Sequence, residues 1–457
     1  MKTIIYFMKT NNKSILLLIS FLLFSLSIFS QDAAIDSLKN ELSIHKEKDT
    51  IRVNLLNAMI YEIFKKDTEK AKDLIKEVEL LSKNLDFIKG EADAFFLKGQ
   101  IEMREHNYVK SIRYFNESMD LQESINNKKG IASAYNGIGT AYTYQHNYDK
   151  AMANYEKSAA INEEINDLKG TAGILNNIAN VYSRLGKYDE AIINYTKSKA
   201  IKKKLNDLKG VSDSHKNIGL LYYRQNNFPK ALESYNKVLD ASINNGDLSM
   251  QARMLNSIGA VYFSKGDYED ALTFFKKSYT ISEQIGEKKI SLTSLGNIGA
   301  ICLNQGKYTE ALECFNKCLS IYKENNNKEG MARSIYNMSS VYHELHQYDK
   351  TLKYIEKSLL LYKELNDRGQ IASCLANKGT VYADLKKFPE ALTFITESLR
   401  ISKEINDKTE LSGGYFQLGD LRLLMGQPKM ALKNYKTCLE LSLAMENKVY
   451  TCYAHIG

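Results

Sequence analysis

The sequence predicts an all-helical solenoid built from a helix pair that repeats at an interval of about 40 residues. One slot of the repeat holds a small residue along most of the chain: Gly99, Gly139, Ala179, Gly219, Gly259, Gly299, Ser339, Gly379 and Gly419. A second small slot follows twelve residues later: Ser111, Ala151, Ala191, Ala231, Ala271, Ala311, Thr351, Ala391 and Ala431. Only three of the 457 residues are proline, which favours long, unbroken helices.

Residues 1–30 have the composition of an export signal. A lysine-containing start precedes an apolar run from Ile15 to Phe29, and polarity resumes at Ser30. This run of about 15 residues is shorter than the ~20 that a membrane-spanning helix needs, so we expect a cleaved signal peptide that begins at Met1 or Met8. An uncleaved anchor is the alternative. In either case we expect the array to be exported to the periplasm or cell envelope.

The repeats occupy most of the remaining chain. Residues 31–50 are expected to form a short helical lead-in, and ten consecutive units of equal length follow over residues 51–450. The segment 451–457 then starts a further repeat and stops inside its first helix. Because a solenoid normally ends in a polar capping helix, this end of the sequence resembles a truncation.

Each unit is predicted to be a helix, a short turn and a second helix. In residues 131–170, apolar and small residues recur at spacings of three and four before and after an interruption at His146 and Asn147. Turn-forming residues then close the unit at residues 166–170. All three prolines fall in the first turn of a second helix, where a missing amide hydrogen costs nothing: Pro229, Pro389 and Pro428. The small slots let the two helices approach closely, and a Tyr or Phe four residues after the second slot fills the space beside them.

This pattern resembles the tetratricopeptide repeat, whose signature has aromatic, Leu, Gly, Tyr, Ala and Phe positions. The matching residues in one unit are Tyr135, Ile138, Gly139, Tyr142, Ala151 and Tyr155. Two features differ from the family: Glu163 stands where the family has a late Pro, and the period is longer than the roughly 34 residues of the family. The resemblance implies a right-handed superhelix of antiparallel helix pairs, whose first helices line a concave groove.

Composition and motifs argue against several functional classes. The formal net charge of +8 is small for this length, and no block rich in Lys and Arg occurs, so we expect no nucleic-acid partner. No phosphate-binding loop, nucleophile elbow or paired-cysteine metal motif is present. His343 and His346 are three residues apart rather than four, and His346 occupies a turn slot. We therefore expect no enzymatic activity, no cofactor and no metal.

All six cysteines lie beyond residue 300, and the repeat pattern indicates that most of them are packing residues. Cys318 and Cys438 occupy a slot that holds serine in six other units. A disulfide remains an alternative, because export would permit one, and a metal at Cys314 and Cys318 is a further one.

The most suggestive polar feature is a ladder of amides two residues before the first small slot: Asn177, Asn217, Asn297, Asn337 and Asn377. The resemblance implies that this part of the first helix faces the groove, where an amide can both donate to and accept from a peptide backbone. Further amides would widen the strip: Asn136, Asn176, Asn180 and Asn256. Arg253 and Arg333, four residues ahead of the ladder, could add a preference for anions. The alternative is that the amides join one repeat to the next by bonding backbone carbonyls.

We therefore predict a non-enzymatic, exported scaffold that binds a protein or an extended peptide in its groove. The alternative is the N-terminal sensory input region of a larger signalling protein, a histidine kinase or a transcriptional regulator, truncated at its C-terminus. A membrane would be contacted only through an uncleaved leader or a missing C-terminal segment.

Overall fold

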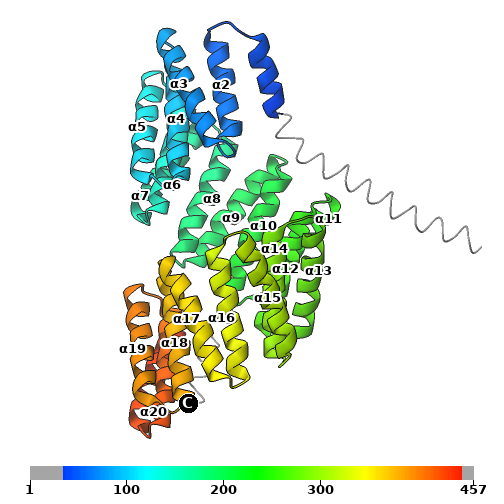
Figure 1. The fold of residues 1–457 in the computed structure, drawn as a ribbon. Coiled ribbons are helices and arrows are strands. Elements are labelled where there is room, and N and C mark those ends of the chain that lie inside the picture. The colour runs from blue at the N-terminus through cyan, green and yellow to red at the C-terminus, as the bar shows by residue number, and fades with distance from the viewer. Residues whose placement is uncertain (1–33, 445–457) are drawn as a thin grey trace, which may run out of the picture. The chain divides into compact units, whose positions relative to one another are not determined.

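The computed structural model describes residues 34–444, which are almost entirely helical and contain no strand (Figure 1). The proposed leader and the incomplete final repeat lie outside the described residues. Residues 34–44 are helical, and ten antiparallel pairs follow. The first helices of the pairs are α2 (Thr50–Ile63), α4 (Ile88–Arg104), α6 (Lys128–Tyr144), α8 (Leu168–Arg184), α10 (Leu208–Arg224), α12 (Leu248–Lys265), α14 (Lys288–Asn304), α16 (Lys328–Glu344), α18 (Arg368–Asp384) and α20 (Lys408–Leu424). The second helices are α3 (Thr68–Asn84), α5 (Tyr108–Ser124), α7 (Tyr148–Glu164), α9 (Tyr188–Lys204), α11 (Phe228–Asn244), α13 (Tyr268–Gln284), α15 (Tyr308–Glu324), α17 (Tyr348–Glu364), α19 (Phe388–Glu404) and α21 (Pro428–Ala444).

The turns repeat twice as often as the side-chain pattern. From Asp86 to Gly426, a residue with positive φ follows the end of each helix, so each of the eight repeats from residue 91 to residue 410 contains two such turns. Glycine or asparagine holds most of these positions, and His106, His146 and His346 hold three others, with φ between 55° and 63°. His346 is therefore a turn residue, as predicted. The turn within a repeat and the turn between repeats both contain a residue with positive φ. The 40-residue period therefore comes from the pattern of side chains rather than from the spacing of these turns.

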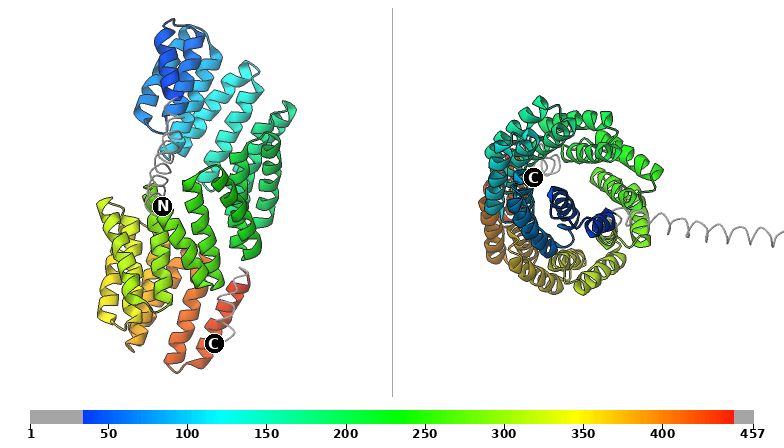
Figure 2. Two further views of the ribbon diagram at one scale, coloured as in Figure 1. Left: turned by 90° about the vertical axis from the view of Figure 1, so that its right-hand side faces the viewer. Right: turned by 90° about the horizontal axis from the view of Figure 1, so that it is seen from above.

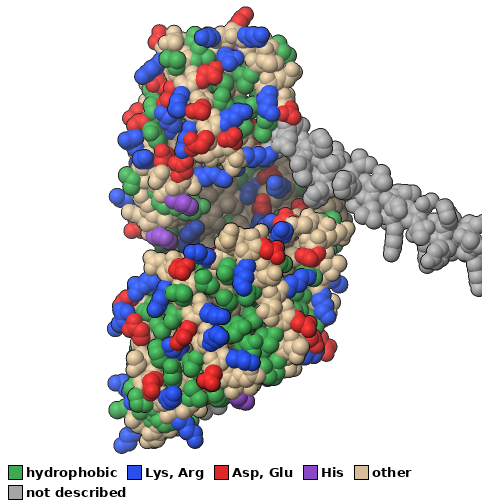
Figure 3. Space-filling model, in the orientation of Figure 1, with side chains coloured by type: hydrophobic (Ala, Val, Ile, Leu, Met, Phe, Trp, Pro, Cys, Tyr) green, Lys and Arg blue, Asp and Glu red, His purple; other side chains and the backbone are tan. Residues whose placement is uncertain are grey.

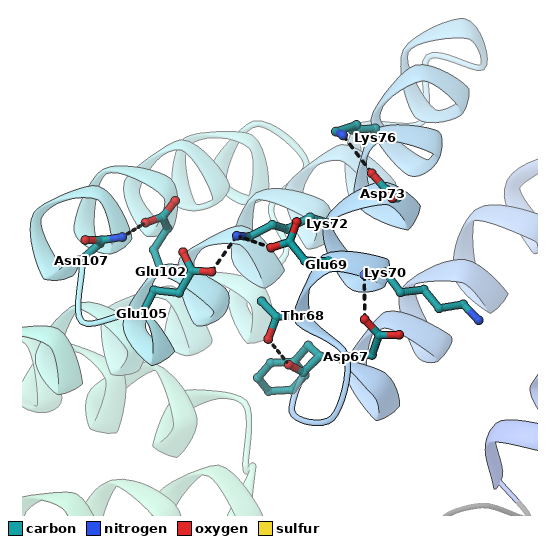
Figure 4. Close-up of polar contacts among 11 residues, drawn as sticks. Asp67, Thr68, Glu69, Lys70, Lys72, Asp73, Lys76, Glu102, Glu105 and Asn107 are labelled. Carbon is teal, nitrogen blue, oxygen red and sulfur yellow. Dashed lines mark hydrogen bonds and ion pairs between the residues drawn. The ribbon is translucent and has the colours of Figure 1, made fainter. Parts of the chain in front are cut away.

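Caps and ion pairs fix the helix ends, as Figure 4 shows for α3 and α4. Asp67 caps α3 by accepting a hydrogen bond of 3.0 Å from the backbone amide of Lys70. The ammonium of Lys72 bonds Glu69 on its own helix at 3.1 Å and Glu105 at the end of α4 at 2.6 Å (Figure 4). This second contact joins the two repeats at the surface.

In six repeats the first small slot holds a glycine against which an aromatic ring packs. A Cβ atom added to Gly259 would lie 2.8 Å from the ring of Phe275, which is buried on the second helix of the same repeat. The same contact pairs Gly99 with Phe115, Gly139 with Tyr155, Gly219 with Tyr235, Gly299 with Phe315, and Gly419 with Tyr435. The predicted close approach of the two helices is thus confirmed.

A buried serine on the second helix joins the two helices of a repeat. Its hydroxyl donates to a backbone carbonyl 26 residues earlier, as Ser278 does to Ala252 at 2.7 Å and Ser158 to Ala132 at 2.7 Å. Cys318 occupies this slot and directs its thiol to the carbonyl of Leu292 at 3.6 Å. The five cysteines in the described part of the chain are free thiols, and four of them are buried, so they are packing residues there.

The chain divides into two compact units, with the boundary between Ile218 and Gly219. Within each unit, neighbouring first helices contact each other, as α4 contacts α6 and α12 contacts α14, while contacts between neighbouring second helices are sparser. The first helices therefore form the inner side of each curved stack, and Figure 2 shows the successive pairs from two further directions. Lys and Arg side chains are interspersed with Asp and Glu on the face drawn in Figure 3. None of the helices in the described part is long and apolar enough to cross a membrane.

Candidate functional site: cavities along the first helices

Three cavities lie at the same position of three different repeats. Each is bordered by the C-terminal halves of neighbouring first helices and by the second-helix residue of the aromatic slot. We name them after that residue: the Phe115 cavity in the first unit, of about 620 Å³, and the Ile355 and Ile395 cavities in the second, of about 500 and 390 Å³. The inner face of the stack is therefore not uniform, and its hollows follow the repeat.

Aromatic and basic groups line the Phe115 cavity. Tyr108 and Tyr144 stack with their ring centroids 5.7 Å apart, and Phe96 adds a third ring. Lys65 and Arg104 lie at the same wall, and no carboxylate is among the described residues that line it. This cavity offers apolar surface together with positive charge.

The packing pattern changes in the repeat that borders the Ile355 cavity. Ile355 replaces the aromatic residue, Thr351 replaces the small alanine, and Ser339 replaces the glycine. The Ser339 hydroxyl donates to the carbonyl of Tyr336 at 2.6 Å. An isoleucine is also shorter than a phenylalanine or tyrosine, so Ile355 fills less of the space between the helices.

The Ile395 cavity lies one repeat later, where an isoleucine again replaces the aromatic residue. Here Ile395 packs closely against Gly379, since an added Cβ would lie 2.6 Å from its Cγ1 atom. Its rim carries two carboxylates, Asp384 and Asp420. The Tyr435 hydroxyl donates to Asp420 at 2.6 Å, and partial removal of water raises the pKa of the Asp420 carboxyl above its usual range. Gln417 also lines the cavity, and its buried Oε1 atom accepts no hydrogen bond within the described part of the chain.

A histidine and a carboxylate link the two cavities. His343, on the wall of the Ile355 cavity, bonds Asp384, on the wall of the Ile395 cavity, with Nε2 and Oδ2 2.7 Å apart. Ser340 lines the same wall as His343, but no hydrogen bond joins the two among the described residues. A serine nucleophile needs that bond for activation, so this arrangement is not an assembled triad.

The predicted amide ladder has two parts. Asn177 donates to Asn136 at 2.8 Å, Asn297 donates to Asn256 at 3.2 Å, and Asn377 donates to the Tyr336 hydroxyl at 2.5 Å. These bonds join consecutive repeats, as the structural alternative expected, but the acceptors are side chains rather than backbone carbonyls. Asn180 accepts a hydrogen bond from the hydroxyl of Tyr195 in its own repeat.

The remaining amides keep their hydrogen-bonding capacity. Among residues 34–444, the side chains of Asn176, Asn217 and Asn337 make no hydrogen bond, and all three are half-buried. They are the ladder positions at which an incoming backbone finds an unoccupied donor and acceptor.

The two arginines lie apart from the cavities. Arg333 is exposed, and its guanidinium donates to the Tyr322 hydroxyl on α15 at 2.8 Å. Arg253 is exposed as well, and neither arginine lines the three cavities described above.

Sequence reasoning missed one column, five residues after the first small slot, that borders all three cavities. It reads Arg104, Tyr144, Arg184, Arg224, Ser264, Asn304, Glu344, Asp384 and Leu424. Basic residues occupy its early members and acidic residues its later ones. Aligning the repeats slot by slot would have shown this change of sign, because it is visible in the sequence.

A tetratricopeptide repeat family model matches residues 91–164, 170–244, 250–324 and 330–404, and a second such model matches residues 412–444. A search of curated protein sequences found no relative.

Solved structures of similar fold include a quorum sensor, a Rap protein and a Rap conjugation gene regulator. The apo form of the quorum sensor NprR from B. thuringiensis is 15% identical, with a TM-score of 0.51 over 85% of this chain and 98% of that one. A Rap protein complexed with Competence and Sporulation Factor is 16% identical, with a TM-score of 0.51 over 79% of this chain and 99% of that one. The Rap conjugation gene regulator of the plasmid pLS20, in complex with the Phr* peptide, is 14% identical, with a TM-score of 0.53 over 79% and 96%.

At these identities the solved structures establish the fold alone, which is an all-α solenoid of antiparallel helix pairs as predicted. The family models cover more than half of the chain and follow the helix pairs seen in the structure. The chain therefore belongs to the tetratricopeptide repeat family.

Proposed function

We propose that this chain is a non-enzymatic scaffold that binds a protein or an extended peptide along the inner face of its first helices. The observation that carries this proposal is the recurrence of open cavities at one repeat position on that face. Peptide side chains can enter such cavities while the backbone meets polar groups between them. Two of the similar structures contain a peptide or factor, Phr* and Competence and Sporulation Factor, which supports a ligand of this class.

The free amides supply the polar part of this site. Asn217 and Asn337 each offer a donor and an acceptor that no other group in residues 34–444 uses. Such contacts recognise a backbone rather than a particular side chain, so sequence preference would come from the cavities.

A displayed library of random peptides tests this proposal against the full chain. We expect enrichment of binding peptides, and we expect the double variant Asn217→Ala with Asn337→Ala to weaken their binding at unchanged thermal stability. The matched control is Asn177→Ala with Asn297→Ala, which removes amides already bonded between repeats. If no peptide is enriched, or if the enriched peptides bind the first variant as tightly as the parent chain, the proposal is wrong.

We further propose that the chain is exported. The order of lysines, apolar run and small residue in residues 1–30 supports this proposal. Fusion of residues 1–40 to alkaline phosphatase, which is active only after export, should give activity. An inactive fusion would refute export.

The alternative is a sensory region of a larger signalling protein. Two of the similar structures, a quorum sensor and a conjugation gene regulator, favour a regulatory role. The mass of the product in its native host distinguishes the two. A product much heavier than 52.0 kDa supports the sensory region, whereas one at or just below that mass supports the free-standing scaffold.

A further inference from the structure

We propose that the Ile355 and Ile395 cavities together bind a peptide segment in which an aliphatic residue lies next to a lysine or arginine. This inference rests on the proposed function and names the chemistry of its ligand. The two cavities are neighbours, since Thr380 lines both and the bonded pair His343 and Asp384 connects their walls.

The aliphatic part follows from the aliphatic side chains that line the two cavities. Every repeat from residue 91 to residue 330 has Phe or Tyr at the position equivalent to Ile355 and Ile395. These two cavities are therefore bordered by an aliphatic side chain where those repeats have an aromatic ring. Leu303 and Val381 border the Ile355 cavity. Leu423 and Leu424 border the Ile395 cavity and are 53% and 60% exposed. Covering these exposed leucines with an aliphatic side chain would be favourable.

The basic part follows from charge and from an unpaired acceptor. Glu344, Asp384 and Asp420 lie on the walls, and no Lys or Arg is among the described residues that line the two cavities. Glu344 forms no ion pair within residues 34–444. The buried Oε1 of Gln417 also lacks a donor. An ammonium or guanidinium group can donate several hydrogen bonds at once to such acceptors.

The fold itself does not require these acids. At the same repeat position, the Phe115 cavity has Arg104 where the second unit has Glu344 and Asp384. The negative charge is therefore a property of this pair of cavities, which distinguishes their ligand from one that the Phe115 cavity would accept.

The occupant is an extended segment rather than a compact small molecule. Both cavities are lined by first-helix residues, and α18 contributes Thr380 to both. Asn337 lies on α16, whose C-terminal half borders the Ile355 cavity, and its amide makes no hydrogen bond within residues 34–444. A peptide backbone running along these first helices can use that amide while successive side chains enter the cavities.

Fluorescence anisotropy of the full chain with labelled synthetic peptides tests the inference. The first peptide carries a leucine flanked by lysines, the second carries the same leucine flanked by glutamates, and the third has alanine between the lysines. We expect the first to bind about tenfold or more tightly than either of the others at low salt, since one charge-assisted hydrogen bond contributes about that factor.

Two variants locate the binding. Glu344→Gln with Asp420→Asn should remove the preference for lysine over glutamate, while the control Asp240→Asn with Glu313→Gln, on exposed second-helix positions, should leave it unchanged. Ser339→Gly with Ile355→Phe introduces the glycine and the ring that other repeats carry, as in Gly259 with Phe275. The larger side chain takes up space in the Ile355 cavity, so this variant should bind the leucine peptide no better than the alanine peptide, at unchanged helicity by circular dichroism.

The outcomes separate this inference from the proposed function. Equal binding of the lysine and glutamate peptides, or an unchanged preference in the carboxylate variant, would overturn the inference. If library peptides bind but prove acidic, the inference falls and the scaffold function stands. If no peptide of any kind binds, both fall.

Discussion

Two glycines in α14 should respond in opposite ways to the same substitution. Gly296 and Gly299 both lie inside the helix, where alanine is favoured over glycine by about 1 kcal/mol. A Cβ at Gly296 would have no atom within 4 Å, so Gly296→Ala should raise the free energy of unfolding by about that amount.

At Gly299 the helix preference is opposed by a clash. The added Cβ would lie 2.7 Å from Cε1 of Phe315 and 3.1 Å from Cβ of Cys314, and overpacking of this kind costs about 1–3 kcal/mol. Gly299→Ala should therefore be neutral or destabilising by up to about 2 kcal/mol. Relative to Gly296→Ala it should be less stable by about 1–3 kcal/mol.

Urea unfolding followed by circular dichroism measures this difference, and hydrogen exchange in α14 and α15 localises it, because a repeat array need not unfold in one step. The double variant Gly299→Ala with Phe315→Leu removes the clashing ring atoms and should cost less than the sum of its single changes. If Gly299→Ala stabilises the chain as much as Gly296→Ala does, the argument that the ring dictates the glycine is refuted.

Three further results are expected. Ser278→Ala removes a buried hydrogen bond to Ala252 and should lower the free energy of unfolding by about 1 kcal/mol, measured in urea. Burial raises the pKa of the Cys374 thiol to about 12, so this thiol should react with a disulfide reagent at pH 8 only after unfolding. The thiol ionises at lower pH in the unfolded chain than in the folded one. The free energy of unfolding should therefore fall as the pH rises above 9.0, the ordinary pKa of a cysteine thiol. Asn297→Ala should lower the urea midpoint slightly and Asn337→Ala should not, since only Asn297 forms a hydrogen bond with the preceding repeat. Rapid labelling of Cys374 in the folded chain would contradict the cysteine prediction. Equal urea midpoints of the two asparagine variants would contradict the last one.

Much of the fold could be predicted because the same packing positions recur in successive repeats. A glycine that faces an aromatic ring, such as Gly259, recurs at a constant interval, and so does a buried serine such as Ser278. Each repeat then confirms the position of the next, and the prolines mark the helix starts independently. The closer spacing of the turns is less visible, because Gly, Asn, His, Asp and Lys all occupy the positive-φ position.

The candidate site was harder to predict because no single residue type marks its cavities: one is bordered by Phe115 and the other two by isoleucines. An isoleucine at position 355 does not by itself indicate a cavity. The difference becomes clear only in the structure, where the equivalent residue Phe275 packs its ring against Gly259. The amide ladder illustrates a second difficulty. Asn297 and Asn337 are equivalent in sequence, but Asn297 meets Asn256 in the preceding repeat, whereas the corresponding residue before Asn337 is Gly296. Whether an amide is free depends on a neighbour 41 residues away.

Photo-crosslinking gives the most direct test of peptide binding on the first-helix face. A library-selected peptide carrying a benzophenone group would be irradiated with the full chain, and the attached residues identified by mass spectrometry. We expect attachment to the C-terminal halves of first helices, such as α16 (Lys328–Glu344) and α18 (Arg368–Asp384). Attachment mainly to the exposed faces of second helices, such as α17 (Tyr348–Glu364) and α19 (Phe388–Glu404), would contradict it.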